Sequence, residues 1–369
     1  MSATAIPPAW AQVRRVLLLR LDGMGDVLMS TPAMAAVREC LPQATLSLLS
    51  SPAGAALAPH LPWLDQVLSY EAPWVRPGEA SQGGPAGEGG ADEALLLQLR
   101  RERFDAAIIF STCTQSALPA ALMCRLARIP LRLAHARESC YGLLSHRLPE
   151  PDALGPAMRH EVQRQLDLVA SVGLHTVNPG LRFALRAADV QRVAALLAEA
   201  GLPPGRPYLL LHPGASAPSR RYPPEAFAAA VAVLSGEGGP ALAVCAGPGE
   251  AGLLQRLGAA LPRPPLQLPG PPSLGELGAL IGGACLLIAN NSGPVHLAAA
   301  LGTPVVTLYA LTNPQHTPWR VPSRVLSHEV PCRDCLKSVC PQGHQRCLTG
   351  VPPEAVTRAA WELLAEAAS

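Results

Sequence analysis

The sequence predicts an α/β protein made of two doubly wound lobes, each built on a parallel sheet. Its 369 residues are too many for a single hydrophobic core, and this length favours about two domains. In both halves of the chain, apolar runs of strand length alternate with segments of helical periodicity, as an open parallel sheet requires. A hydrophobic content of 49% with 15% charged residues is typical of well-packed globular domains.

The N-terminal half begins with a strand, a turn and a helix. Arg15–Leu21 (RVLLLRL) has the pattern of a buried strand, Asp22–Asp26 (DGMGD) that of a turn, and Val27–Cys40 carries apolar residues at helical spacing. Turn or helix signals also bound two further predicted strands, Thr45–Leu49 and Ala106–Phe110. We therefore expect an open parallel sheet in this half.

A Gly- and Pro-rich segment interrupts that alternation. Residues 71–91 (EAPWVRPGEASQGGPAGEGGA) show no periodicity that could bury a face, so they predict a mobile surface loop that folds over a bound acceptor. The last helix of the first lobe is expected at His160–Val172, with Gly173 and Pro179 as stop signals. The first lobe is expected to span residues 1–185.

The second half repeats the alternation and is expected to form a second lobe over residues 186–350. Its predicted strands are Tyr208–His212, Ala241–Cys245, Leu286–Ala289 and Val305–Tyr309, and its predicted helices are Pro224–Leu234, Leu274–Ile281 and Pro294–Leu301. A last amphipathic helix over Pro353–Ala367, within the segment 351–369, is expected to cross back to the first lobe. Two facing lobes would place the carboxyl ends of both sheets around one cleft, where open α/β sheets bind ligands.

Charge and hydropathy exclude several classes of partner. The formal net charge is only +2, and no Lys/Arg-rich run suggests a nucleic-acid footprint. The first residues lack a signal peptide, and no apolar stretch approaches the roughly 20 residues of a membrane-spanning helix. We therefore expect a cytoplasmic protein whose membrane contact is at most peripheral to the inner membrane. Its ten cysteines are then reduced thiols or metal ligands.

The turn after the first predicted strand carries a carboxylate. Gly23 and Gly25 resemble the start of a dinucleotide fingerprint, but its third glycine is replaced by Leu28, which removes the main support for a nicotinamide or flavin site. Asp26 stands at the start of a helix and at the mouth of the expected cleft, where it could accept a proton from an attacking sugar hydroxyl. The structural alternative is that Asp26 merely caps the helix.

The turn after the strand Tyr208–His212 (HPGASAPSRRYP, residues 212–223) carries paired cations. Arg220 and Arg221 could neutralise the charge that develops on a diphosphate leaving group, because arginine presents parallel donors to phosphate oxygens. Ser216 adds a hydroxyl in the same turn. A solvated arginine pair at a helix start is the alternative.

A third turn, residues 289–296 (ANNSGPVH), leads from a buried strand into a helix. Ser292 and Gly293 precede Pro294, which marks the helix N-terminus. Free backbone N–H groups and the helix dipole make such a terminus a suitable anion site for a pyrophosphate. An ordinary capped turn explains the local pattern equally well.

Together, RLDGMGDVLMSTPAM, HPGASAPSRRYPPEAF and NNSGPVHLAAALGTPVV resemble glycosyltransferase family 9, the heptosyltransferase-like family with two Rossmann-like lobes in the GT-B fold. The resemblance covers nearly the whole chain. It implies an inverting, metal-independent transfer of heptose from ADP-heptose to the lipopolysaccharide core or a related surface glycan, with no cofactor required. It also implies a lipid-linked acceptor at the inner leaflet, an N-terminal lobe for the acceptor and a C-terminal lobe for the donor.

The resemblance also assigns roles to single residues. Asp26 matches the family's catalytic base, and Arg220 stands where the family usually has a lysine on the donor phosphates. Asn291 replaces the family's aspartate, which weakens heptose as the donor sugar because a neutral amide offers a different hydrogen-bond set. The remaining matches are Gly23 and Gly25 on the acceptor side, and Ser216, Ser292, Gly293 and His296 around the donor diphosphate.

The cysteine-rich segment 332–347 is a candidate structural metal site. Cys332, Cys335, Cys340 and Cys347 have the spacing C-x2-C-x4-C-x6-C, and a C-x2-C pair can supply two thiolates to zinc or iron. Four thiols within so short a segment could equally pack as small hydrophobic side chains.

Two other function classes stay open at this point. The departure at Asn291 would suit a non-catalytic sugar-nucleotide or glycan-binding subunit of a surface-polymer assembly complex. A nucleotide-sugar epimerase would also use two facing lobes of this kind, since fold alone does not fix function.

Overall fold

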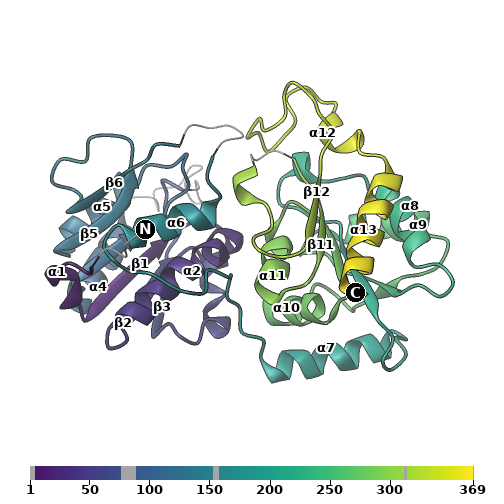
Figure 1. Ribbon diagram of the computed structural model, residues 1–369, viewed down its shortest axis with the longest axis horizontal. Helices are drawn as coiled ribbons and strands as arrows, with labels where there is room; N and C mark the ends of the chain where they lie inside the picture. Colours follow the sequence, from purple (N-terminus) through teal and green to yellow (C-terminus); the bar gives the residue numbers. More distant parts are fainter. Residues whose placement is uncertain (1–4, 76–88, 153–157, 311–313, 369) are drawn as a thin grey trace. The chain divides into compact units, whose positions relative to one another are not determined.

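The computed structural model describes residues 5–75, 89–152, 158–310 and 314–368. The chain divides into two compact units, Met1–Arg182 and Phe183–Ser369. Each unit contains a six-stranded parallel sheet with helices on both faces (Figure 1). The division falls three residues before the boundary expected after residue 185.

The first sheet has the strand order β3-β2-β1-β4-β5-β6. Neighbouring strands are parallel throughout, and Leu18 of β1 lies opposite Leu48 of β2 and Ile108 of β4. β1 lies at the centre of this sheet, and Val16–Leu19 within it are apolar and buried. The strands are β1 (Arg15–Arg20), β2 (Thr45–Ser50), β3 (Gln66–Ser69), β4 (Ala106–Ile109), β5 (Leu131–Ala136) and β6 (His146–Pro149).

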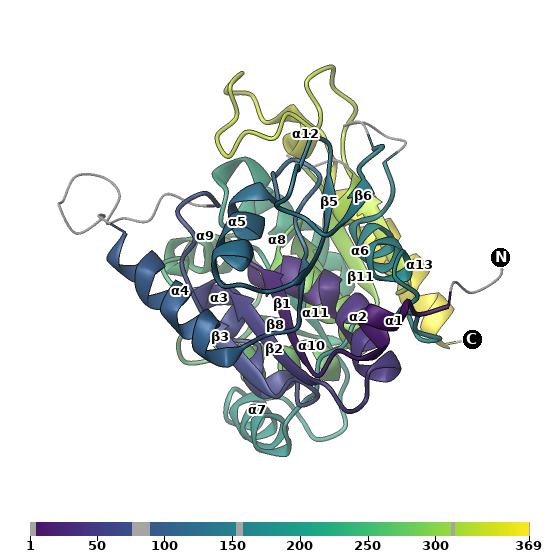
Figure 2. The same ribbon diagram turned by 90° about the vertical axis from the view of Figure 1, so that its left-hand side faces the viewer.

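Helices cover both faces of this sheet. α4 (Gly90–Glu102) and α5 (Leu118–Leu126) bury Leu95, Leu99 and Met123 in one core cluster with alternate residues of the strands. α2 (Met24–Cys40) and α6 (Glu161–Ala170) pack against each other on the other face, as Figures 1 and 2 show. The short elements are α1 (Pro8–Ala11), α3 (Pro52–Ala55) and η1 (Ala58–His60).

The second sheet has the order β12-β11-β10-β7-β8-β9, which repeats the winding of the first. Its strands are β7 (Tyr208–His212), β8 (Ala241–Val244), β9 (Leu266–Gln267), β10 (Leu286–Asn290), β11 (Val305–Leu308) and β12 (Ser323–Leu326). Its helical elements are α7 (Ala187–Glu199), η4 (Pro218–Arg220), α8 (Pro224–Leu234), α9 (Ala251–Ala260), α10 (Leu274–Gly283), α11 (Gly293–Leu301), η5 (Pro314–His316) and α12 (Arg346–Thr349).

The C-terminal helix α13 (Pro353–Ala368) packs within the second unit. Val356, Ala360 and Leu363 lie in the core cluster that also contains Phe227 and Val231 of α8. The expectation that this helix crosses back to the first lobe is therefore corrected. The helix covers β10 and β11, which were predicted, and β12, which was not; the sequence did not show that one face of these strands needed a further helix.

Several predicted elements shift in extent. Helix α2 begins at Met24, not at Val27, because Gly23 takes the extended N-cap conformation and Met24 starts the first turn. Strands β3, β5, β6, β9 and β12 were not predicted. β3, β6, β9 and β12 are short strands at sheet edges, and β5 (LRLAHA) carries the polar residues Arg132 and His135. Most of the predicted mobile loop, residues 76–88, lies outside the described residues, and α4 begins at Gly90.

Among the described residues, none of the helices is both long and apolar enough to cross a membrane.

We expect Asn290→Ala to destabilise the second unit by about 2–4 kcal/mol, because two buried backbone groups would lose their partner. The fully buried Asn290 accepts from the N–H of Tyr222 (3.0 Å) and donates to the carbonyl of Pro213 (2.7 Å). Chemical denaturation measures the change. The control is Ser235→Ala, which removes one hydroxyl bond at the C-cap of α8 and should stay within about 0.5 kcal/mol. Equal effects of both variants would contradict the prediction.

Candidate functional site

Both sheets reverse their strand order beside their first strand. In the first unit this switch point lies between β1 and β4, and in the second between β7 and β10. Open α/β sheets bind ligands outside the carboxyl ends of the strands at such points. The turns predicted to carry the chemistry follow β1, β7 and β10, so all three flank a switch point.

Asp26 is the third residue of α2. Its Oδ2 accepts from the backbone N–H of Gly23 at 3.1 Å, so this oxygen caps the helix. Its Oδ1 lies 3.3 Å from Nη2 of Arg20, and the side chain is 26% exposed. Asp26 therefore both caps the helix and presents a partly exposed carboxylate. The N-cap position itself is occupied by Gly23, not by Asp26. Gly25, in the same turn of helix, is partly exposed.

Arg20 is shared by three carboxylates. Its Nε lies 2.9 Å from Oδ2 of Asp22, its Nη1 donates to Oε1 of Glu161 at 2.8 Å, and its Nη2 faces Asp26. The guanidinium is completely buried. Burial alone would lower the pKa of Arg20, but the carboxylates of Asp22, Glu161 and Asp26 raise it, so the group stays charged.

Asp22 connects this cluster to the loop after β4. Burial raises the pKa of Asp22 above its usual value, although the charge of Arg20 acts in the opposite direction. Its Oδ1 accepts from Nε2 of Gln115 at 2.6 Å. Asp22 and Gln115 also line a cavity of about 230 Å³, together with Trp74, Phe110, Ser111 and Ser116. The two loops at the switch point thus share one polar contact and one cavity.

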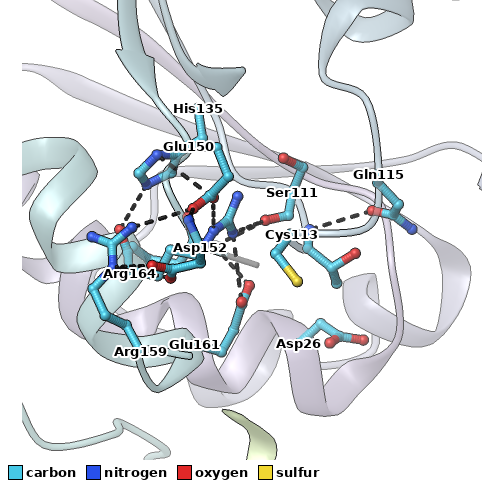
Figure 3. Close-up of polar contacts among 12 residues, drawn as sticks. Asp26, Ser111, Cys113, Gln115, His135, Glu150, Asp152, Arg159, Glu161 and Arg164 are labelled. Carbon is cyan, nitrogen blue, oxygen red and sulfur yellow. Dashed lines mark hydrogen bonds and ion pairs between the residues drawn. The ribbon is translucent and has the colours of Figure 1, made fainter. Parts of the chain in front are cut away.

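A second buried cation continues the network through α6 (Figure 3). Arg164 forms an ion pair with Glu150 and donates to the carbonyl of Ser111, while Glu161 accepts from Nε2 of Gln165 at 2.7 Å. Burial would raise the pKa of Glu150, but the guanidinium of Arg164 holds it below the usual value. The carboxyl ends of β1, β4 and β6 are therefore joined by buried charges.

Sequence reasoning missed most of this network. Its visible signals are Arg20, a charge in the otherwise apolar strand RVLLLRL, and the pair Glu161 and Arg164 at i,i+3 spacing on α6. Charged residues are almost never fully buried without partners, so both features indicate pairing. The identity of the partners depends on contacts between distant segments.

In the second unit, the loop after β7 carries the predicted cations. Ser216 is exposed and Arg220 ends the 3-10 helix η4, partly exposed. Arg221 points elsewhere: its Nε donates to the carbonyl of Ala215 at 2.8 Å, and its Nη2 lies 3.6 Å from Oε1 of Glu250. The structure thus separates the roles of the two arginines, since Arg221 braces its own loop.

Two buried side chains fix this loop against its neighbours. Asn290, at the end of β10, bridges the backbone of Tyr222 and Pro213, as described above. The hydroxyl of Tyr222 donates to the carbonyl of Val351 at 2.7 Å, and its ring packs edge-on against Phe227. Tyr222 is therefore a core residue.

The turn after β10 holds the remaining predicted donor contacts. Ser292 is the N-cap of α11, but its hydroxyl donates to the carbonyl of Asn290 (3.1 Å) and makes no side-chain cap. Gly293 begins the helix and is partly exposed, whereas His296 is buried. Asn291 is buried, and its Nδ2 donates to the carbonyl of Ala310 at 3.3 Å. An aspartate could not donate this bond.

The cysteine segment lies between β12 and α13. Cys332 Sγ is 3.8 Å from Nε2 of His344. Burial raises the pKa of Cys347, and the nearby thiols of Cys340, Cys332 and Cys335 add to this shift. In the part of the chain that the structure describes, no group of three or more His, Cys, Asp or Glu side chains is arranged to hold a metal ion. A metal in this segment stays a prediction.

Comparisons with known proteins show which family this chain resembles. A family model described as glycosyltransferase family 9 (heptosyltransferase) matches residues 93–345. The chain is 26% identical over 366 residues to lipopolysaccharide heptosyltransferase 2 of Salmonella typhimurium, covering 95% of this chain and 99% of that protein. It is 22% identical over 306 residues to a lipopolysaccharide core heptosyltransferase of Haemophilus influenzae, covering 82% and 81% of the two chains.

Solved structures show the same fold. A family 9 glycosyl transferase from Veillonella parvula has a TM-score of 0.80 at 19% identity, covering 98% of this chain and all of that one (100%). E. coli ADP-heptose lipopolysaccharide heptosyltransferase II has a TM-score of 0.71 at 22% identity, with 96% and 100% covered. The predicted fold class, α/β with two parallel-sheet lobes of the GT-B type, is confirmed. Because the family model covers more than half of its length, the chain belongs to glycosyltransferase family 9.

Proposed function

We propose that this protein transfers a sugar, in the first instance heptose from ADP-heptose, to the lipopolysaccharide core or a related surface glycan, with inversion at the sugar carbon. Its relatives support the substrates, since one is named a lipopolysaccharide heptosyltransferase and a solved neighbour carries ADP-2-deoxy-2-fluoro heptose. The observation that carries the proposal is the placement of Asp26: a partly exposed carboxylate at a switch point, with one oxygen fixed by Gly23.

In the proposed reaction, an acceptor hydroxyl attacks the anomeric carbon of the donor. The new bond forms from the hydroxyl oxygen, the bond from that carbon to the diphosphate breaks, and the proton passes to Asp26. Arg20 supports this role because its guanidinium lies 3.3 Å from Asp26 Oδ1 and holds that oxygen in position. No metal is needed for these steps, because protein cations can neutralise the leaving group.

The first unit suits an acceptor, and the second a nucleotide donor. The cavity lined by Asp22, Trp74 and Gln115 offers hydrogen-bonding groups beside an aromatic ring, which is a common way to hold a sugar. In the second unit, Arg220 and the N-terminus of α11 at Gly293 offer a cation and backbone donors to the diphosphate. Asn291 stands in the same turn, where its amide nitrogen donates to the carbonyl of Ala310.

We expect Asp26→Asn to lower kcat by about 10²- to 10⁴-fold, because the amide keeps the shape of the side chain but cannot accept the proton. Product formation is measured with the matching nucleotide-heptose donor and lipopolysaccharide-core acceptor. Donor affinity should stay unchanged.

The matched control is Asp92→Asn. Asp92 occupies the same third position of α4 that Asp26 occupies in α2, and it bonds to the hydroxyl of Tyr70. The Asp92→Asn variant should retain the turnover of the unaltered protein. Near-normal turnover of Asp26→Asn would exclude Asp26 as the base. If the unaltered protein binds the nucleotide sugar but neither transfers nor hydrolyses it, the chain is a binding subunit instead.

We expect Arg220→Ala to weaken binding of the nucleotide diphosphate by about 10- to 100-fold, because a charge-assisted phosphate contact is lost. A thermal-shift panel of ADP, UDP and GDP first selects the nucleotide, and calorimetry then gives its Kd. The control is Arg206→Ala in the same unit, where an exposed arginine donates to the carbonyl of Gly239. Unchanged affinity in Arg220→Ala would reject Arg220 as the phosphate clamp.

We propose separately that the cysteine segment binds a structural zinc or iron ion. The thiols of Cys332, Cys335, Cys340 and Cys347 are near enough to influence one another, but in their described positions they form no complete ligand set. Elemental analysis of aerobic and anaerobic preparations should find about one equivalent of metal. It should be lost in Cys332→Ser/Cys335→Ser and kept in Cys285→Ser. Less than a tenth of an equivalent in the unaltered protein would reject the metal.

A further inference from the structure

A surface of the first unit combines arginines with exposed apolar side chains, away from the proposed site. It lies on α4, α5 and the residues that follow them, on the side that Figure 2 turns toward the viewer. We call it the arginine-leucine patch. Its members are Leu97, Arg100, Arg101, Arg103, Leu122, Arg125, Leu126, Arg128 and Tyr141.

Both helices place an exposed leucine and an arginine three residues later on one solvent-facing side. Leu97 of α4 is followed by Arg100 and Arg101, and Leu122 of α5 by Arg125 and Leu126, in both cases at positions i+3 and i+4 on one helical face. The three leucines are 46–50% exposed. Each helix therefore places arginine next to leucine on its solvent-exposed face. Core packing does not require this pattern.

Side-chain contacts hold the parts of the patch together. Arg100 Nε donates to the carbonyl of Leu126 at 3.0 Å, which joins α4 to α5. Arg125 Nη1 donates to the carbonyl of Gly142 at 2.7 Å, which brings Tyr141 beside α5. Arg103 and Arg128 share the rim of a surface hollow of about 280 Å³. The patch is thus one continuous surface.

The arginines of the patch are not held in ion pairs in the part of the chain that the structure describes. Across residues 5–75, 89–152, 158–310 and 314–368, none of its five arginines forms an ion pair with a carboxylate. The acidic residues near them in sequence are engaged elsewhere. Glu102 pairs with Arg15, Asp105 accepts from the backbone of Arg14 and Arg15, and Glu138 bonds to Ser116.

Three members of the patch also adopt backbone conformations that favour glycine. Arg103 (φ 50°), Arg128 (φ 64°) and Tyr141 (φ 44°) all have positive φ. Helices usually end on glycine in this conformation, because a Cβ is strained there. Tyr141 is in addition 92% exposed. Large side chains stand at strained, exposed positions where they contribute little to the fold, which indicates that they serve a contact with something else.

We propose that the arginine-leucine patch docks the first unit on an anionic membrane surface. The guanidinium groups would bind lipid phosphates, while Leu122, Leu126 and Tyr141 would enter the interface between headgroups and acyl chains. Charge complementarity favours this occupant, because a second copy of the chain would bring the same five positive charges to the contact. The proposal is independent of the transfer reaction and needs no nucleotide.

The experiment is co-sedimentation of the full chain, without nucleotide, with vesicles of phosphatidylcholine containing phosphatidylglycerol. Binding should rise steeply with the anionic fraction and fall with salt. Arg103→Gly/Arg128→Gly should lower the vesicle affinity roughly 25-fold, at about fivefold per arginine near a membrane. Its Tm should be unchanged or higher, because glycine relieves the backbone strain. A purely structural role for these arginines predicts a lower Tm and unchanged vesicle binding.

The matched control is Arg263→Gly/Arg320→Gly, which changes the net charge equally. Both arginines are exposed in the second unit, and Arg320 also has a positive φ of 52°. This variant should bind vesicles like the unaltered protein. Leu122→Ser/Leu126→Ser should weaken the binding that remains at high salt.

Three outcomes would overturn the proposal. These are equal binding to vesicles of phosphatidylcholine alone, equal loss in both arginine pairs, or no vesicle binding together with a dimer that the patch variants dissociate. Light scattering of each variant detects the last of these.

Discussion

The first unit depends on one buried positive charge. Arg20 is completely buried, and three carboxylates, from the turn after β1, from α2 and from α6, compensate its charge. Removing one partner from a buried ion pair typically costs about 3–5 kcal/mol, because an uncompensated charge stays behind. Such a cluster is stable only when all its elements are in place. The strand, the first turn of α2 and the start of α6 are therefore fixed together, and Asp26 is the member of the cluster that reaches solvent.

In the second unit, a neutral side chain instead of a buried charge joins the loops beside the switch point. Its switch point also brings the loops after the first and fourth strands of the sheet together, but the bridge is the amide of Asn290. An amide can donate and accept at once, so it satisfies a backbone N–H and a carbonyl without burying a charge. Arg220, at the end of η4, is the cation that we propose for a bound anion. Arg221 is already used to brace the loop.

The buried contacts of Tyr222 and Asn291 explain why these side chains suit their positions. Tyr222 keeps an aromatic ring in the core and uses its hydroxyl to bond the carbonyl of Val351. Asn291 uses its amide nitrogen on Ala310, at the end of β11, so the exchange of aspartate for asparagine matches the local backbone.

The sequence by itself determined the fold class, the family resemblance and most buried elements, because the spacing of apolar residues and the glycine-bearing turns are local properties of the chain. It also singled out Asp26, Arg220 and the turn at Ser292. Only the tertiary structure decided which groups these residues meet. Contacts such as Arg20 with Glu161, or Asn290 with Tyr222, join segments far apart in the chain, and no local pattern encodes them. For the same reason, α13 was assigned to the wrong lobe until the extent of the second sheet was known.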